Sequence, residues 1–159
     1  MNGNSDFGDL LRAFANEGVR YLIVGGYAMI HHTEPRFTKD LDLWVDRKKR
    51  NAERVYRALS RFGAPLEDVS EADFMNPSVI FQVGVEPNRV DIIMSVLGLS
   101  FDSAWRRRVR GTYDGMPIPV LSKADLVKNK AALNRPRDQL DVLALKPPRQ
   151  KHKSKKPRS

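Results

Sequence analysis

The sequence predicts an α+β (α/β) fold, in which a small mixed β-sheet is flanked by helices and followed by a helical C-terminal part. Short apolar runs of strand length alternate with amphipathic segments of helical period, an order typical of a mixed domain. Gly, Pro and Asp-Gly turn signals separate these segments. One run, Asp40-Leu41-Asp42-Leu43, alternates charged and apolar residues, as a strand with one buried face does. We expect its carboxylates on central strands.

The first half of the chain is predicted to alternate helices with buried strands. Ser5 caps the first helix, and glycine ends helices at positions 18 and 63. The predicted elements are a helix from Ser5 to Gly18, a strand over Tyr21–Val24, a tight turn at Gly25-Gly26, a short helix over Tyr27–His31, a polar loop over His32–Lys39, a strand over Leu41–Val45 and a helix over Lys48–Phe62.

The second half is predicted to hold two hairpins and three helices, after an irregular stretch from Leu66 to Pro77. Asp114-Gly115 is a strong hairpin turn signal, and Pro136 suits a first helical position. The predicted elements are strands over Val79–Val85 and Arg89–Val96, a helix over Phe101–Arg108, strands over Val109–Tyr113 and Met116–Val120, a helix capped by Ser122 and Asp125 that ends at Leu133, and a helix from Pro136 to Leu145.

Asp40 and Asp42 are the first candidate site residues. Successive side chains of a strand point to opposite faces, so these two share one face, roughly 6.6 Å apart at Cα, while Leu41 and Leu43 enter the core. Two carboxylates held side by side repel each other by about 4 kcal/mol at about 4 Å and an effective dielectric constant near 20. A divalent cation is the usual group that offsets such repulsion.

Gly25-Gly26 and Asp91 extend this candidate site. A turn after a strand exposes backbone N–H groups that bind phosphate oxygens, and glycine permits the close approach. Asp91 lies between Val90 and Ile92, and on a strand adjacent to the first pair it would complete a three-carboxylate metal site. The alternative interpretation is that these residues bind no ligand. In that case the glycines form an ordinary turn, and Asp91 either faces water from an edge strand or pairs with Arg89.

Composition and charge bound the remaining possibilities. The chain of 159 residues fits one domain, has no cysteine and therefore no disulfide or thiolate metal site, and contains no P-loop motif. Its N-terminus lacks a signal-peptide pattern and no apolar run approaches the roughly 18 residues of a membrane span, so a cytoplasmic location without membrane contact is expected.

The positive charge is concentrated at the C-terminus. Residues 146–159 carry seven Lys or Arg and no acid, so subtracting seven from the net charge of +9 leaves about +2 for residues 1–145. Such tails are typically disordered and either bind polyanions or only aid solubility. A second basic cluster, Arg106-Arg107-Arg108 with Arg110, is either an RNA contact or a solvated helix face with Trp105 in the core.

These residues resemble the signature of the DNA polymerase beta-like nucleotidyltransferase superfamily: a Gly-Gly turn, an Asp-x-Asp pair and a third carboxylate on a later strand. The matching residues are Gly25-Gly26, Arg36, Thr38, Asp40-Leu41-Asp42-Leu43 and Val90-Asp91-Ile92. From Ile118 onward the chain is similar to the small AbiEii-type toxin (minimal nucleotidyltransferase) branch, with Lys130 as its helical lysine. Arg137 stands where that branch often has lysine.

The resemblance implies the site residues and cofactors. Asp40, Asp42 and Asp91 would be catalytic and would hold two Mg²⁺ ions, with Mn²⁺ as an alternative: one ion binds the triphosphate of an NTP and the other activates an acceptor hydroxyl. Asp91 would help to deprotonate that hydroxyl. The implied nucleotide-binding residues are Gly25, Gly26, Arg36, Thr38 and Lys130.

The acceptor is the open part of the prediction. Residues 1–145 would form the nucleotidyltransferase domain, and the basic extensions favour RNA, in particular tRNA, in a toxin–antitoxin or phage-defence setting with a cognate antitoxin. A small antibiotic, such as an aminoglycoside or lincosamide, or a partner protein is the alternative, although a near-neutral body argues against cationic drugs. A third hypothesis is a non-catalytic nucleic-acid-binding module that retains the fold.

Overall fold

The fold is that of a computed structural model, which describes residues 5–35, 40–85 and 88–146 of the chain. Helices and strands alternate along the sequence. Their bounds are α1 Ser5–Asn16, β1 Tyr21–Val24, α2 Gly25–His32, β2 Leu41–Val45, α3 Lys49–Phe62, the 3₁₀ helix η1 Glu71–Met75, β3 Ile80–Val83, β4 Val90–Ile93, α4 Phe101–Arg106, β5 Val109–Tyr113, β6 Met116–Val120, α5 Lys123–Leu133 and α6 Pro136–Leu145.

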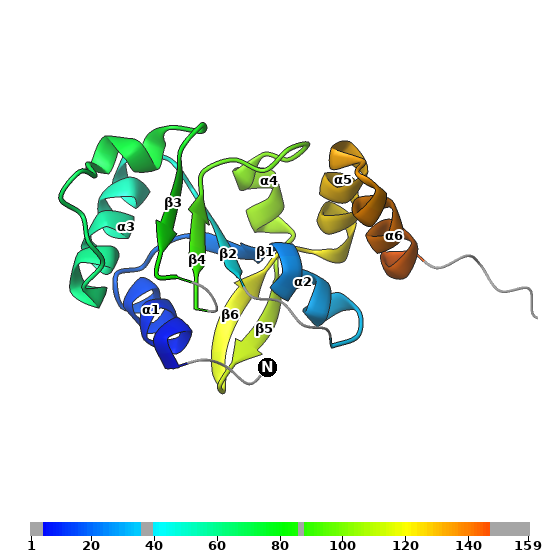
Figure 1. The fold of residues 1–159 in the computed structure, drawn as a ribbon, viewed down its shortest axis with the longest axis horizontal. Helices are drawn as coiled ribbons and strands as arrows, with labels where there is room; N and C mark the ends of the chain where they lie inside the picture. The colour runs from blue at the N-terminus through cyan, green and yellow to red at the C-terminus, as the bar shows by residue number, and fades with distance from the viewer. Residues whose placement is uncertain (1–4, 36–39, 86–87, 147–159) are drawn as a thin grey trace, which may run out of the picture.

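The six strands form one mixed sheet in the order β3-β4-β2-β1-β6-β5 (Figure 1). β2 pairs antiparallel with β1 and parallel with β4, so both β2 and β4 lie inside the sheet. The antiparallel hairpins β3–β4 and β5–β6 supply the two edge strands. In Figure 1, α1 and α3 lie together at one end of the molecule, and α5 and α6 form a separate pair at the other.

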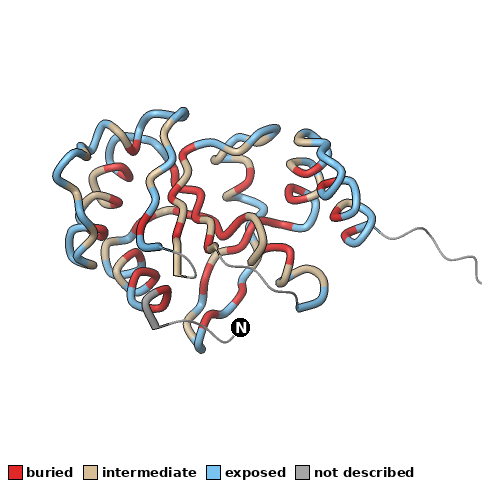
Figure 2. Tube along the Cα trace, viewed as in Figure 1, coloured by how far each residue is buried: buried red, intermediate tan, exposed pale blue. Residues whose placement is uncertain are grey.

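Strand β2 runs through the core because both of its faces are covered. Leu41 and Leu43 are fully buried on one face. Trp44 is buried on the other face, where its ring meets the ring of Phe101 edge-on at a centroid distance of 5.2 Å. Figure 2 shows that buried positions follow the central strands and the helix faces turned toward them. Asp42 is the one polar residue of this strand, and it is half-buried where the other four residues are buried.

The predicted architecture is confirmed: a mixed sheet with flanking helices and two C-terminal helices. β5 and β6 occupy the predicted residues and turn at Asp114 and Gly115, whose φ angles of 49° and 78° are those of a tight hairpin turn. The strands of the other hairpin are shorter than predicted, but they pair antiparallel as expected.

Three local predictions are corrected. Gly25 and Gly26 do not form a separate turn; they open α2, because Gly25 at φ 65° leads the chain from β1 directly into the helix. The stretch predicted as irregular contains η1, which begins with a capping box between Ser70 and Asp73. Trp105 is half-buried and packs against the core rather than within it, and the guanidinium of the exposed Arg108 lies over its ring at 3.9 Å from the centroid.

Several predicted features lie outside the described residues. They are the nucleotide-binding candidates Arg36 and Thr38, residues 86–87 between the predicted strands Val79–Val85 and Arg89–Val96, and the basic tail from residue 147 onward. Within the described ranges, none of the helices is both long enough and apolar enough to cross a lipid bilayer.

Candidate functional site

Two neighbouring parallel strands place three carboxylates on one face of the sheet. Asp42 of β2 is in register with Asp91 of β4, and residues paired in this way project to the same face. Asp40 precedes Asp42 by two residues and therefore shares that face. The β2–β4 pairing thus brings together the three predicted carboxylates, which we call the carboxylate face.

Arg89 lies within the carboxylate face and binds two of its members. Its Nη2 donates to Asp40 Oδ2 at 2.8 Å, and its Nε donates to Asp91 Oδ1 at 3.1 Å. The side chains of Arg89 and Asp40 are each 28% exposed and that of Asp91 is 16% exposed, so these ion pairs are partly shielded from water. Asp91 therefore combines two of the arrangements that the sequence left open: it lies beside Asp42 and it pairs with Arg89.

Asp42 is the most perturbed acid of this group. Burial, and after it the negative charges of Asp91 and Asp40, raise the pKa of Asp42 to about 7, although two nearby cations oppose the shift. Gly25 packs so closely against this carboxylate that a Cβ at position 25 would lie 2.2 Å from Asp42 Oδ2. The Asp42 carboxylate can therefore lie here only because residue 25 is a glycine.

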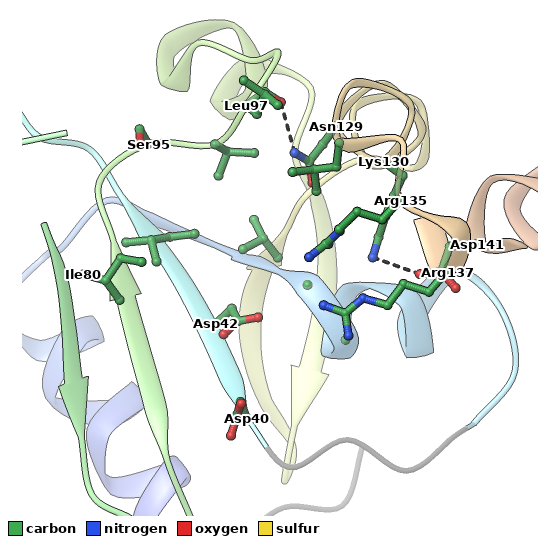
Figure 3. Close-up of a pocket in the computed structure, with 16 residues that line it drawn as sticks. Asp40, Asp42, Ile80, Ser95, Leu97, Asn129, Lys130, Arg135, Arg137 and Asp141 are labelled. Carbon is green, nitrogen blue, oxygen red and sulfur yellow. Dashed lines mark hydrogen bonds and ion pairs between the residues drawn. The ribbon is translucent and has the colours of Figure 1, made fainter. Parts of the chain in front are cut away.

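Asp40 and Asp42 open into a cleft of about 810 Å³ between the sheet and the α5–α6 pair (Figure 3). Gly25 and Gly26 lie at its base, where β1 passes into α2. One side of the cleft is apolar, and it is formed by Ile80, Ile93, Val96 and Leu97; Leu133 of α5 also lines the cleft. Large apolar side chains beside a few convergent polar groups are typical of a ligand site.

The opposite wall of the cleft is cationic. Lys130 of α5 is nearly buried and forms ion pairs with Asp141 at 2.9 Å and with Asp138 at 3.6 Å. Arg135 also pairs with Asp138, and its side-chain hydrogen bond lowers the pKa of Asp138 to about 2. In Figure 3, Lys130, Arg135 and Arg137 project from the α5–α6 pair toward β2. Lys130, predicted as a nucleotide-binding residue, therefore lines the same cleft as Asp40 and Asp42.

The connection between α5 and α6 determines this cationic wall. Asn134, at φ 52°, ends α5 in the left-handed conformation, and Pro136 opens α6 at its first position. Arg135 and Arg137 flank that proline, so both reach the cleft. Sequence reasoning missed Arg135 as a site residue. The available signal was two arginines around a helix-opening proline, just after the helix that carries Lys130.

The carboxylate face suits a divalent cation by its chemistry. Carboxylate oxygens are the ligands that Mg²⁺ prefers, and a cation would relieve the repulsion that raises the pKa of Asp42. Across the described ranges, no three acidic, histidine or cysteine side chains already surround a common metal position. Arg89 instead bridges Asp40 and Asp91. The donor set fits Mg²⁺, and Asp40, Asp42 and Asp91 are the residues that could hold it if the Arg89 side chain moved away.

The sequence matches no family model, and no curated protein aligns with it. Its structure does resemble solved structures. The lincosamide antibiotic adenylyltransferase LnuA, solved with lincomycin bound, is 16% identical with a TM-score of 0.58, over 91% of this chain and 97% of that one. A Thermotoga maritima protein described as a nucleotidyltransferase is 18% identical with a TM-score of 0.55, over 84% of both chains. ANT(2″)-Ia, solved with adenylyl-2″-tobramycin, is 14% identical with a TM-score of 0.55, over 89% of this chain and 85% of that one.

These likenesses show that the chain has the nucleotidyltransferase fold. The match extends over most of both chains in each pair. A shared fold hosts different chemistries, and function has to be argued from the site itself.

Replacement of Gly25 by alanine is expected to disturb Asp42. The added Cβ would collide with the carboxylate while the residue keeps a φ of 65°, so the free energy of unfolding should fall by about 2–3 kcal/mol. Gly63→Ala is the matched control, because its φ is 94° but no atom lies within 4 Å of the new Cβ; it should cost about 1 kcal/mol. Denaturant unfolding measures both, and equal losses would contradict this packing.

The raised pKa of Asp42 predicts a dependence of stability on pH. The unfolded chain releases this proton near pH 3.8 and the folded protein near pH 7, so the folded state binds more protons in between. The contribution of Asp42 to stability is therefore most favourable below pH 4 and becomes less favourable as pH rises to about 7. In metal-free buffer at pH 8, Asp42→Asn should be more stable than the wild type by roughly 1–3 kcal/mol, and at pH 4 the difference should vanish. If the difference in unfolding free energy between Asp42→Asn and wild type is the same at pH 4 and at pH 8, the raised pKa of Asp42 is contradicted.

Proposed function

We propose that the protein is a Mg²⁺-dependent nucleotidyltransferase of the EC 2.7.7 type, which moves a nucleoside monophosphate from an NTP to an acceptor hydroxyl. The observation that carries the proposal is a single cleft with Asp40 and Asp42 of the carboxylate face on one side and the cationic wall on the other; Asp91 is in register with Asp42 on the neighbouring strand. Transfer from a triphosphate needs both, since the phosphate oxygens require cations and the reacting phosphorus requires a metal held beside it.

The triphosphate would lie between α2 and the α5–α6 pair. Gly25 and Gly26 bring backbone N–H groups to the base of the cleft, at the start of a helix of eight residues. Lys130 and Arg135 are held by acidic partners on α6, and Arg137 adds a third positive charge. Arg36 and Thr38, between α2 and β2 in sequence, remain part of the proposed phosphate site.

Asp40, Asp42 and Asp91 would hold the metal, which supplies charge neutralisation of the triphosphate and polarises the attacking oxygen. Mn²⁺ has the same preference for oxygen ligands and is the natural substitute. A metal also explains why a half-buried Asp42 with a pKa of about 7 sits on this strand, because a nearby cation favours its ionised form.

The chemical step is an in-line displacement at the α-phosphorus. The acceptor O–H gives its proton to the carboxylate of Asp91 as the new O–P bond forms, and the bond between the α-phosphorus and its bridging oxygen breaks to release pyrophosphate. Burial is the leading cause that raises the pKa of Asp91, and a raised pKa improves a carboxylate as a proton acceptor. The products are the acceptor joined to the nucleoside monophosphate through a phosphodiester bond, and pyrophosphate.

A small organic molecule is the acceptor that we favour. LnuA and ANT(2″)-Ia, which match over most of their own lengths, were solved with lincomycin and with adenylyl-2″-tobramycin respectively. The apolar side of the cleft offers surface to such an acceptor, since Ile80 is 61% exposed and Leu97 58% exposed. The cationic wall makes an acceptor with few positive charges, of the lincosamide kind, a better match than an aminoglycoside.

RNA, in particular tRNA, is the second candidate, and exposed arginines support it. Arg106 of α4, Arg110 of β5 and Arg108 between these elements are exposed, and an RNA acceptor would suit the AbiEii-type toxin branch with its antitoxin partner. Part of this cluster serves the fold, however, because Arg107 forms an ion pair with Asp125 at 2.9 Å.

Label transfer tests the proposed function. The full-length protein is incubated with Mg²⁺ and each of the four NTPs labelled at the α-phosphate, in turn with lincosamides, aminoglycosides and total tRNA. We expect transfer to one acceptor class, loss of that transfer when EDTA removes the metal, and a decrease of more than about 100-fold for Asp42→Asn.

Asp68→Asn is the matched control, since Asp68 is an exposed aspartate outside the cleft, and it should transfer at the wild-type rate. Transfer that is equal in Asp42→Asn and wild type, or no transfer to any acceptor with any nucleotide, would refute the proposal. Tight RNA binding that survives loss of all three carboxylates, without transfer, would identify a binding module instead.

A further inference from the structure

Arg89 has no part in the proposed reaction, although it binds two of the carboxylates that the reaction needs. Its guanidinium makes three close contacts: Nη2 to Asp40 Oδ2 at 2.8 Å, Nε to Asp91 Oδ1 at 3.1 Å and Nη2 to Asp91 Oδ2 at 3.4 Å. A single side chain therefore engages both oxygens of one carboxylate and one oxygen of the other.

The strand register places Arg89 in this position. Arg89 precedes Asp91 by two residues, so both side chains leave the sheet on the same face. The backbone carbonyl of Arg89 accepts a hydrogen bond from Leu41 N at 3.1 Å, which brings Arg89 beside Asp40 on the neighbouring strand. The bridge thus follows from the same β2–β4 pairing that forms the carboxylate face.

A guanidinium and a divalent cation compete for the same oxygen lone pairs. When two N–H groups of an arginine bind a carboxylate, they occupy lone pairs of its oxygens that a metal ion would otherwise use. Asp40 and Asp91 have short side chains on paired strands, whereas Arg89 has a long one that is 28% exposed. The arginine can therefore move into solvent while the carboxylates stay in place.

We propose that Arg89 is a positioning residue that occupies Asp40 and Asp91 in place of a divalent cation, and that yields them when the metal arrives with nucleotide. This inference rests on the proposed function, because it requires the carboxylate face to bind metal. Arg89 neutralises the metal-free site and lowers its affinity for the free ion. Nucleotide restores that affinity, since its phosphate oxygens complete the coordination of the metal.

Binding of Mn²⁺ to the full-length protein tests this role. Electron paramagnetic resonance of the free aqueous ion measures the affinity, with and without the α,β-methylene analogues of the four NTPs, which hold metal but resist transfer. Without nucleotide, Arg89→Gln should bind Mn²⁺ about tenfold more tightly than wild type, whereas a merely structural role would make binding weaker. With the bound analogue, this difference should shrink to about twofold or less.

Arg110→Gln is the matched control, because Arg110 is an exposed arginine on β5 without an acidic partner among the described residues, and it should bind like the wild type. If circular dichroism shows that Arg89→Gln does not fold, Arg89→Lys is measured instead. Lysine keeps the positive charge but cannot bind both carboxylates as the planar guanidinium does, so its affinity for Mn²⁺ should be about threefold higher than that of wild type. Unchanged or weaker binding in a folded Arg89 variant, while wild type binds Mn²⁺ with nucleotide, overturns this inference alone. No Mn²⁺ binding by any variant under any condition overturns the proposed function as well.

Discussion

The repulsion among three carboxylates on two paired strands is the constraint on which the rest of the site depends. The register of β2 with β4 sets Asp42 beside Asp91, and the alternation of the strand adds Asp40 to the same face. Burial leaves Asp42 with a pKa near 7, and Arg89 bridges the other two acids. Arg89 offsets part of this negative charge, and in the function that we propose a divalent cation bound with a nucleotide would replace it.

The fold surrounds this face with elements suited to a nucleotide. Gly25 has no side chain, and the Asp42 carboxylate occupies the space that a Cβ at this position would need. α2 begins at Gly25, which lines the cleft. Across the cleft, α6 holds Lys130 through Asp141 and Asp138, so the lysine is oriented before any ligand arrives. Such preorganisation lowers the cost of ordering charged side chains when the ligand binds. The apolar side is left for the part of a substrate that carries no charge.

Much of the fold could be predicted from the sequence, because strand alternation, turn residues and helix caps act locally. The β5–β6 hairpin and α6 fall on the predicted residues for this reason. Asp40, Asp42 and Asp91 could be picked out as carboxylates in apolar strands. The bridge of Arg89 to Asp40 could not, since it joins residues 49 positions apart and depends on the β2–β4 register. Arg135 was missed because its local signal, two arginines around a helix-opening proline, does not by itself show that the side chain lines the cleft; that depends on how α5 and α6 pack against each other.

The central claim is that one cleft binds a metal–nucleotide complex between the carboxylate face and the cationic wall. A crystal structure of the full chain with Mn²⁺ and a non-hydrolysable NTP analogue, with anomalous diffraction measured at the manganese edge, tests it most directly. The account predicts manganese bound by Asp40, Asp42 and Asp91, with the triphosphate against Gly25–Gly26 and Lys130. Nucleotide bound elsewhere on the protein, or manganese that avoids all three aspartates, would contradict it.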